Sequence, residues 1–296
     1  MSAELFLNFL IAGIMIGTLY ALMAMGITFI YSIMRMINWA MGEFYMIGSY
    51  VQYFLISFLL GGSLWYLGVA GTAAVLFLFG LIIQWLLIRP MFSTSMERKD
   101  EYGTVVTIAL ALFLRNFATV LSGPNTRTPD INLGRLMIGP LPISGNRFAA
   151  FIGAIVVILV FYILLNYTWL GRAFRASAQN RIAVQTVGIN ILRIDQIAFA
   201  IGVTLAGIAG ALLAPVFNVF PENGAVTTMK GFEIIIIGGM GSLPGAALGG
   251  LLLGIVESLG SVFIDPSLRN VYGFIFLIIV LLIKPTGLFG EKERLS

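Results

Sequence analysis

Long apolar runs separated by short polar stretches make up most of the 296-residue chain. A helix that crosses the hydrocarbon core of a bilayer needs about 20 predominantly apolar residues. Most of these runs approach or exceed that length, so the pattern predicts an all-α, polytopic membrane helical bundle of about eight to nine spans. The expected spans are Leu5–Tyr31, Ile37–Leu60, Leu64–Ile88, Thr104–Leu121, Phe148–Tyr167, Ile194–Phe220, Phe232–Leu243, Pro244–Phe263 and Val271–Ile283.

Two of these runs look interrupted. Ile37–Leu60 contains Glu43 and Gly48, and Phe232–Phe263 is broken by a glycine-rich stretch. Broken helices at membrane depth are tolerated where they are buried in protein or line a polar cavity. We therefore expect broken or re-entrant helices, whose residues are candidates for a translocation path or a hinge. The candidates are Glu43, Gly48, Glu233, Gly238, Gly239, Gly241 and Pro244.

Glu43, Glu233 and Glu257 lie within or beside apolar runs. A carboxylate at the centre of a bilayer costs about 2.5 to 3.5 kcal/mol even on insertion scales. The three side chains should therefore face the bundle interior, a polar cavity or the membrane interface. Two interpretations stay open: the carboxylates line a translocation path, or each is buried against a helix terminus or an arginine.

A shift of the sequence by 190 residues aligns Gly17 with Gly207 and Glu43 with Glu233. The aligned glutamates are the stronger evidence for an internal repeat, because acidic residues are rare in this chain. The two units begin on opposite sides of the predicted membrane, which indicates a candidate inverted repeat of the kind found in transporters. Glu257 has no counterpart, so we expect it to tolerate replacement by Gln better. The halves would be residues 5–168 and 194–284.

The composition supports a membrane protein with one domain, residues 1–296. Hydrophobic residues make up 59% of the chain and charged residues only 10%, whereas soluble domains average about 25% charged residues. The chain has no Cys and no His, which excludes a thiolate nucleophile, a His general base and a His metal ligand. We expect no catalytic residue, metal site or cofactor. The net charge of +4 suits orientation on a membrane better than binding of nucleic acid.

A polar, arginine-bearing stretch at residues 171–193 separates two apolar runs. Its alanines favour a short helix, on which Arg172 and Arg175 share one face. Gly188 should end that helix in the left-handed conformation, which glycine adopts without a Cβ penalty. The simplest interpretation is a cytoplasmic loop whose arginines orient the flanking spans.

Basic residues set the expected orientation. The 171–193 loop and the C-terminal tail with Lys284, Lys292 and Arg294 should face the cytoplasm. Counting spans backwards then places the loop Ser122–Arg147 and the N-terminus outside. That loop contains four prolines, so we expect an ordered cap rather than a regular helix there.

Several motifs resemble the permease subunits of bacterial branched-chain amino acid ABC importers, in particular the LivH-like branch. The first is Gly171-Arg-Ala-Phe-Arg-Ala176, followed by Gln179 and by Gly188-Ile189. The others lie at Asn38–Phe44, Leu205–Ala211, Ile237–Ala246 and Lys284–Gly290. Together the motifs extend over most of the chain.

This resemblance implies a permease subunit in the bacterial inner membrane that moves branched-chain or other hydrophobic amino acids, or related small amides. It implies three kinds of partner: a second, LivM-like permease, two ATPase subunits and a periplasmic substrate-binding protein. The chain contains no Walker phosphate loop, so if it belongs to an ATP-driven machine, the ATPase must be another chain. The resemblance also implies that the 171–193 loop couples to the ATPases through Gly171, Arg172, Arg175, Ala176, Gln179, Gly188 and Ile189.

The sequence departs from the family pattern at Asn180, where an acid often follows the Gln, and at Arg115-Asn116, where we expect an uncharged polar residue. Alternative functions stay open at this point. A gradient-driven secondary transporter or channel would fit the repeat and the buried glutamates. An ABC permease for urea, amides or sugars would fit the same motifs.

Overall fold

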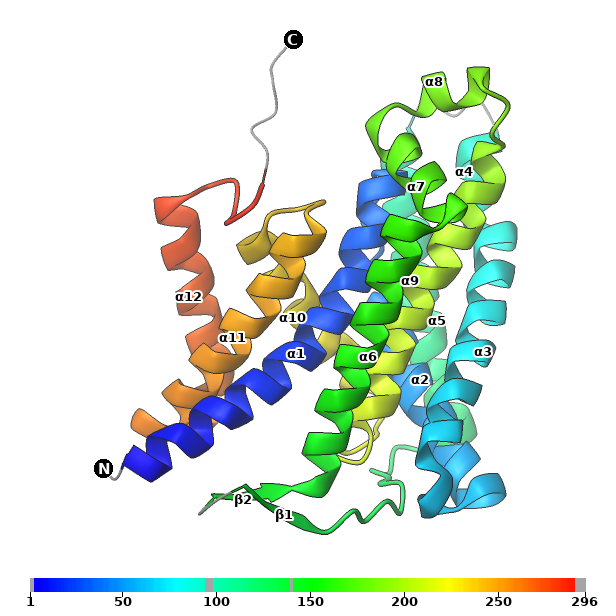
Figure 1. The fold of residues 1–296 in the computed structure, drawn as a ribbon. Helices are drawn as coiled ribbons and strands as arrows, with labels where there is room; N and C mark the ends of the chain where they lie inside the picture. The colour runs from blue at the N-terminus through cyan, green and yellow to red at the C-terminus, as the bar shows by residue number, and fades with distance from the viewer. Residues whose placement is uncertain (1–2, 94–97, 139–140, 291–296) are drawn as a thin grey trace.

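The computed structural model describes residues 3–93, 98–138 and 141–290, and Lys292 and Arg294 of the predicted cytoplasmic tail lie outside them. The described chain is a bundle of long helices with one short hairpin at its lower end (Figure 1). The predicted all-α membrane bundle is therefore confirmed. The N-terminus and helix α8 lie at opposite ends of the bundle, which we call the hairpin end and the α8 end.

The α-helices are α1 (Ala3–Met34), α2 (Met41–Leu55), α3 (Trp65–Ile83), α4 (Arg89–Ser93), α5 (Lys99–Ser122), α6 (Gly145–Tyr167), α7 (Trp169–Gln179), α8 (Arg181–Thr186), α9 (Ile191–Leu213), α10 (Asn223–Gly238), α11 (Leu243–Phe263) and α12 (Arg269–Ile283). Short π- or 3-10 turns extend several of them: η1 (Ile56–Leu60), η2 (Gly62–Leu64), η3 (Gln84–Ile88) and η4 (Pro266–Leu268). Strands β1 (Arg135–Ile138) and β2 (Leu141–Ser144) pair antiparallel.

Eight helical segments of the described chain are long and apolar enough to cross a membrane. They match eight of the nine expected runs. The remaining run, predicted as Phe232–Leu243, belongs instead to α10, which begins at Asn223 and ends at Gly238. With 16 residues, α10 is about 24 Å long and too short to cross the whole hydrocarbon core.

The first predicted interruption is real but misplaced. Helix α2 runs without a break through Gly48, so the expectation of a broken helix at Gly48 is wrong. The irregular segment instead precedes α2, at residues 35–40, where Arg35 has a positive φ of 54°. Gly48 is a packing contact, because a Cβ there would lie 2.2 Å from the carbonyl oxygen of Gly207 on α9.

Small residues let the central helices pack closely. On α1 and α11, a Cβ at Gly17 would lie 2.8 Å from the Leu251 carbonyl oxygen, and one at Gly254 would lie 2.4 Å from the Cα of Gly17. Two Gly-x-x-x-Gly pairs, Gly13 with Gly17 and Gly250 with Gly254, therefore pack against each other within the chain, as such motifs do in membrane helices. Helix α1 packs along α11, and α9 packs along α3.

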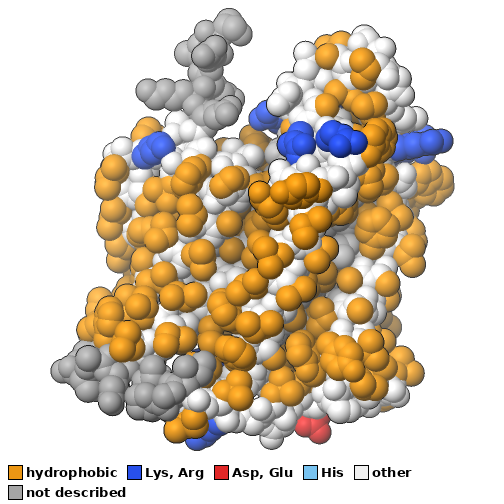
Figure 2. Space-filling model, viewed as in Figure 1, with side chains coloured by type: hydrophobic (Ala, Val, Ile, Leu, Met, Phe, Trp, Pro, Cys, Tyr) orange, Lys and Arg blue, Asp and Glu red, His pale blue; other side chains and the backbone are white. Residues whose placement is uncertain are grey.

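The outer surface carries a broad band of exposed hydrophobic side chains, contributed largely by α3, α5, α6 and α12 (Figure 2). Lys and Arg side chains gather above this band, at the α8 end. The segment 123–144 contains the β1–β2 hairpin and an isolated bridge between Arg127 and Val219. This confirms the predicted ordered cap, although its strands were not foreseen. The chain is a multi-pass membrane protein with a cap at the hairpin end.

Candidate coupling loop and buried ion pairs

The polar 171–193 loop folds into two short helices, α7 and α8, rather than the single helix we expected. The break lies at Asn180, whose backbone is extended with φ −152° and ψ 100°. Its side chain accepts hydrogen bonds from the N–H groups of Ile182 and Ala183. Asn180 is thus the N-cap of α8, and an aspartate side chain could accept the same bonds.

Gly188 ends α8 in the left-handed conformation, as predicted, with φ 82°. Its N–H donates to the carbonyl of Gln185 at 3.1 Å, and the N–H of Ile189 donates to Val184 at 3.3 Å. These two bonds form a Schellman motif, the usual end of a helix that closes on glycine. Gly188 therefore fixes the angle at which the loop turns toward α9.

Arg172 and Arg175 both lie on the exposed side of α7, but their environments differ. The Arg175 guanidinium donates to the carbonyl of Leu165 and, at 3.4 Å, to the Oδ1 atom of Asn166 at the end of α6. Arg172 makes no such bond to the described residues and is available to a partner. Among the other predicted coupling residues, Gln179 is exposed, whereas Ala176 and Ile189 are half-buried and Gly171 is buried.

The 171–193 loop contacts the membrane helices α1 and α9 through two interactions. Phe174 is fully buried and meets Phe29 of α1 edge-on, with ring centroids 5.2 Å apart. Arg181 forms a 2.5 Å ion pair with the buried Asp195 of α9 and donates to the carbonyl of Ile33 at 2.7 Å. Contacts from both α7 and α8 therefore hold the loop against α1 and α9.

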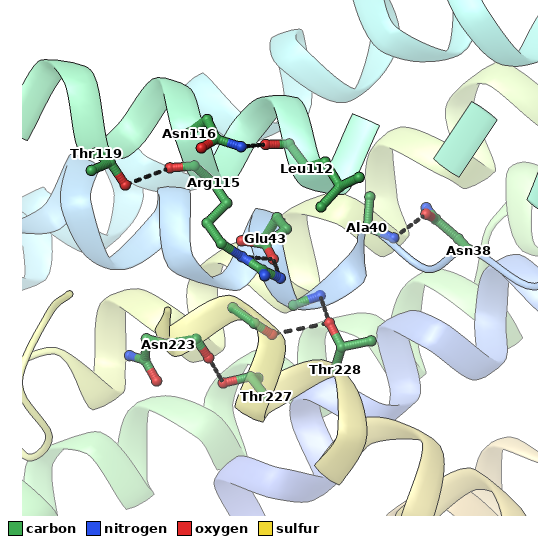
Figure 3. A network of polar contacts seen from close by, with 12 residues as sticks. Asn38, Ala40, Glu43, Leu112, Arg115, Asn116, Thr119, Asn223, Thr227 and Thr228 are labelled. Carbon is green, nitrogen blue, oxygen red and sulfur yellow. Dashed lines mark hydrogen bonds and ion pairs between the residues drawn. The ribbon is translucent and has the colours of Figure 1, made fainter. Parts of the chain in front are cut away.

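Glu43 is fully buried in the first turn of α2 and is paired with Arg115 of α5 (Figure 3). The Arg115 Nη2 and Nε atoms donate to Glu43 Oε1 at 2.6 and 3.2 Å. The other oxygen, Oε2, has no hydrogen-bond partner among the described residues. The arginine that departs from the family pattern is thus the partner of the buried carboxylate, which fits the second interpretation left open for Glu43.

The first turns of α2 and α10 cross beside this ion pair. The Gly42 N–H donates to Thr228 Oγ1 at 3.1 Å, and a Cβ at Gly42 would lie 2.0 Å from the Gly224 carbonyl oxygen. A Cβ at Gly224 would in turn lie 2.1 Å from Glu43 Oε2. Two glycines are therefore needed for both helices to begin inside the bundle at one point.

A second buried cluster joins α10, α11 and α12. Lys230 lies 3.0 Å from Glu233 and 2.5 Å from Glu257, and Arg269 lies 2.8 Å from Glu257. The Tyr20 hydroxyl of α1 donates to Glu257 at 3.1 Å. Because Glu257 makes the largest number of these contacts, the expectation that it tolerates Gln better is not supported.

The ungapped 190-residue offset also fails for the glutamates. Glu43 lies in the first turn of α2, whereas Glu233 lies ten residues beyond the start of α10 at Asn223. Their helical positions are therefore not equivalent. Lys230, Arg269 and Tyr20 were missed as partners, although a lysine between two apolar runs, as at Lys230, was a signal that could have been used.

The glycine-rich stretch forms the tight turn between α10 and α11. Gly239 and Gly241 have φ values of 99° and 85°, and Pro244 lies in the first turn of α11. The C-terminal segment lies against this turn, since Leu288 and Phe289 donate their N–H groups to Ile237 and Gly238. The predicted break in the Phe232–Phe263 region is thus a braced turn between two helices.

Comparison with known proteins shows the family of this chain. Residues 9–283 match the family model described as "Branched-chain amino acid transport system / permease component". The high-affinity branched-chain amino acid transport system permease protein LivH of Escherichia coli is 34% identical, over 97% of this chain and 96% of the relative. BraD of Pseudomonas aeruginosa, named with the same function, is 33% identical over 97% of both chains.

The LivM permease of the Escherichia coli system is more distant, at 24% identity over 91% of this chain and 67% of LivM. No solved structure matches the chain. The chain therefore belongs to the family of branched-chain amino acid transport system permease components.

Proposed function

We propose that this chain is the permease subunit of an ATP-driven importer that moves branched-chain amino acids across a bacterial inner membrane. The observation that carries the proposal is the similarity over 97% of the chain to LivH, which is named as a branched-chain amino acid permease. Two ATPase subunits on separate chains would supply the energy. A periplasmic binding protein would deliver the substrate to the hairpin end.

Helices α7 and α8 are the proposed docking element for the ATPases, at the cytoplasmic end. The cationic side chains around Arg172 and the exposed apolar side chains of Ile182 and Val187 support this assignment, because exposed apolar groups at a polar end favour a protein partner. The anchors at Phe174 and Arg181 would carry ATPase closure into α1 and α9. The docking residues would be Gly171, Arg172, Arg175, Ala176, Gln179, Gly188 and Ile189.

A second, LivM-like permease would complete the membrane part. The similarity of this chain to LivM supports a pair of related subunits with the path between them. Within this chain we propose Glu43 as a path residue and the Gly238–Pro244 turn, with Gly239 and Gly241, as a hinge. The contacts of Gly48 and Glu233 favour structural roles for those two residues.

We also propose that residues 5–168 and 194–284 are two copies in inverted orientation. Helices α1 and α3 run toward the α8 end, whereas α9 and α11 run away from it (Figure 1). The packing of α1 along α11 mirrors that of α9 along α3. The helices, rather than the ungapped sequence offset, would define the correspondence.

Reconstitution into proteoliposomes tests the proposed function. The chain would be combined with a LivM-like permease, the ATPases and a leucine-loaded binding protein, and uptake of labelled leucine measured. We expect uptake that requires ATP hydrolysis and the binding protein and that persists with a proton ionophore. Uptake that survives removal of the ATPases but stops with the ionophore would indicate a gradient-driven transporter instead. Parallel uptake of urea, with its own binding protein, would identify an amide or urea permease.

A further inference from the structure

Helix α5 carries two polar residues, Arg115 and Asn116, deep within an apolar span. Asn116 lies five to six residues from the midpoint of Lys99–Ser122, about 8 Å along the axis and inside the hydrocarbon core. Its side chain is exposed, and its amide donates only to the carbonyl of Leu112 in the same helix. Polar groups at this depth are costly against lipid. Asn116 is therefore more stable where water or a partner subunit reaches it than against acyl chains, although Leu112, Phe113 and Phe117 beside it are exposed apolar side chains.

The Arg115 guanidinium is held in a defined orientation with one edge free. Its Nε and Nη2 atoms both donate to Oε1 of Glu43, whereas Nη1 makes no hydrogen bond to any residue that the structure describes. The Glu43 side chain is 1% exposed and the Arg115 side chain 31% exposed. The pair thus buries its anion and presents its cation, and a guanidinium edge is well suited to binding a carboxylate.

Polar side chains lie beside the Glu43–Arg115 pair, and aromatic side chains lie farther along α5. Asn223 and Thr227 of α10 lie across the ion pair from α5 (Figure 3). About two turns from Arg115 along α5, the Thr107 hydroxyl accepts a hydrogen bond from the backbone N–H of Trp39 at 3.3 Å. The partly exposed Trp39 ring packs on Phe232 of α10, with centroids 4.7 Å apart. Glu43 and Trp39 each contact α5 on one side and α10 on the other, so a cation and an aromatic surface lie about two turns apart along α5.

We propose that Arg115 binds the carboxylate of the amino acid substrate on the translocation path, through its free Nη1 edge, with Glu43 as the positioning residue. This inference rests on the proposed import function and assigns the residue that recognises the substrate within the membrane. The Glu43–Arg115 pair is neutral, and a zwitterionic amino acid is neutral as well. Their complex therefore brings no net charge into the membrane, where net charge is most costly.

Single and double variants separate substrate binding from structural support. In the proteoliposome assay with unmodified binding protein, we expect Arg115→Gln to lower kcat/KM for leucine uptake about tenfold, the effect of losing a charge-assisted hydrogen bond. Arg115→Lys should recover only part of it. The double variant Glu43→Gln/Arg115→Gln leaves no buried charge without a partner. Its kcat/KM for leucine uptake should stay as low as that of Arg115→Gln. Recovery of normal uptake in the double variant would overturn the proposal, and the exposed Arg89→Gln serves as the control.

Accessibility provides a test that does not depend on transport. The chain has no native Cys, so Asn116→Cys can be labelled in the assembled transporter with a charged, membrane-impermeant thiol reagent. We expect labelling at least tenfold faster than at Val156→Cys, an exposed position on α6. Equal, slow labelling at both positions would overturn the path assignment even if ATP-driven uptake is normal. Absence of ATP-driven uptake by the unmodified transporter would instead count against the proposed function.

Discussion

The two buried charge clusters differ in how many helices contact the carboxylate at their centre. Glu43 has one partner, Arg115, whose side chain is partly exposed, and one oxygen without a partner. Glu257 is contacted by Lys230, Arg269 and Tyr20 and ties together four helices. Both clusters are neutral in formal charge, and each includes a partly exposed arginine, with side-chain exposures of 31% for Arg115 and 29% for Arg269. Because Glu257 is contacted from three other helices and Glu43 forms an ion pair with only one, we expect the Glu257 cluster to hold the fold together and the Glu43–Arg115 pair to be free to bind a ligand.

Glu257→Gln should have the largest effect, because it leaves Lys230 and Arg269 facing a single carboxylate, Glu233. Breaking a buried ion pair by removing one partner costs about 3 to 5 kcal/mol. We expect the amount of folded permease in membranes to fall severely, measured by detergent extraction and size-exclusion chromatography. The contrasting variant is Glu43→Gln, which should fold. Normal folding of Glu257→Gln would contradict the claim that the Glu257 cluster holds the fold together.

Reversal of charge on α7 should disrupt coupling while sparing the fold. In the Arg172→Glu/Arg175→Glu variant, ATP-driven uptake should fall to near background, and less ATPase should co-purify with a permease present at its normal level. Arg172→Glu alone is the cleaner variant, because Arg175 also binds the end of α6. Full uptake with normal ATPase recovery in the double variant would contradict docking at this face.

Glu43→Gln should reduce uptake about fivefold, corresponding to about 1 kcal/mol for one weakened hydrogen bond. Membrane insertion should remain near normal, because the substitution removes a charge from the membrane and the remaining Arg115 can reach water through its exposed edge. Initial rates of leucine uptake, normalised to folded permease, measure this effect. An unchanged rate would make Glu43 a purely structural carboxylate.

The smallest effect is expected at Gly188, where φ is 82°. Replacement by Ala should destabilise this turn by about 1 kcal/mol, and replacement by the β-branched Val by more. Nothing lies within 4 Å of a Cβ built at this position, so backbone strain alone would separate the two variants. Limited proteolysis of the loop and ATP-driven uptake should rank Gly above Ala above Val. Equal behaviour of Ala and Val would show that the turn relaxes in the assembled transporter.

The spans could be predicted from the sequence because a lipid environment demands long apolar runs. The start of α10 could not, because its first turns carry Asn223, Thr227 and Thr228, which lie against protein instead of lipid. The break at Asn180 was readable in principle from its capping side chain. Hydropathy reports what faces lipid, whereas caps and buried polar turns report what faces protein.

The ion-pair partners could not be predicted, because pairing across helices depends on how they pack. Glu43 and Arg115 are 72 positions apart in the sequence, and either could have met another charge. The nearest acid to the loop arginines, Asp195, does pair with Arg181. The short stretch of chain between these two residues favours that pairing. Local spacing therefore indicated the loop contacts, and tertiary packing alone fixed the charges within the membrane.

The comparison is tested most directly by measuring two quantities, folded permease per membrane and leucine uptake per folded permease, for Glu257→Gln and Glu43→Gln side by side. We expect Glu257→Gln to lose folded protein while the surviving fraction keeps most of its uptake, and Glu43→Gln to keep folded protein while uptake per molecule falls. If Glu43→Gln instead loses folded protein and transports normally per molecule, the Glu43–Arg115 pair is structural and the translocation path lies elsewhere.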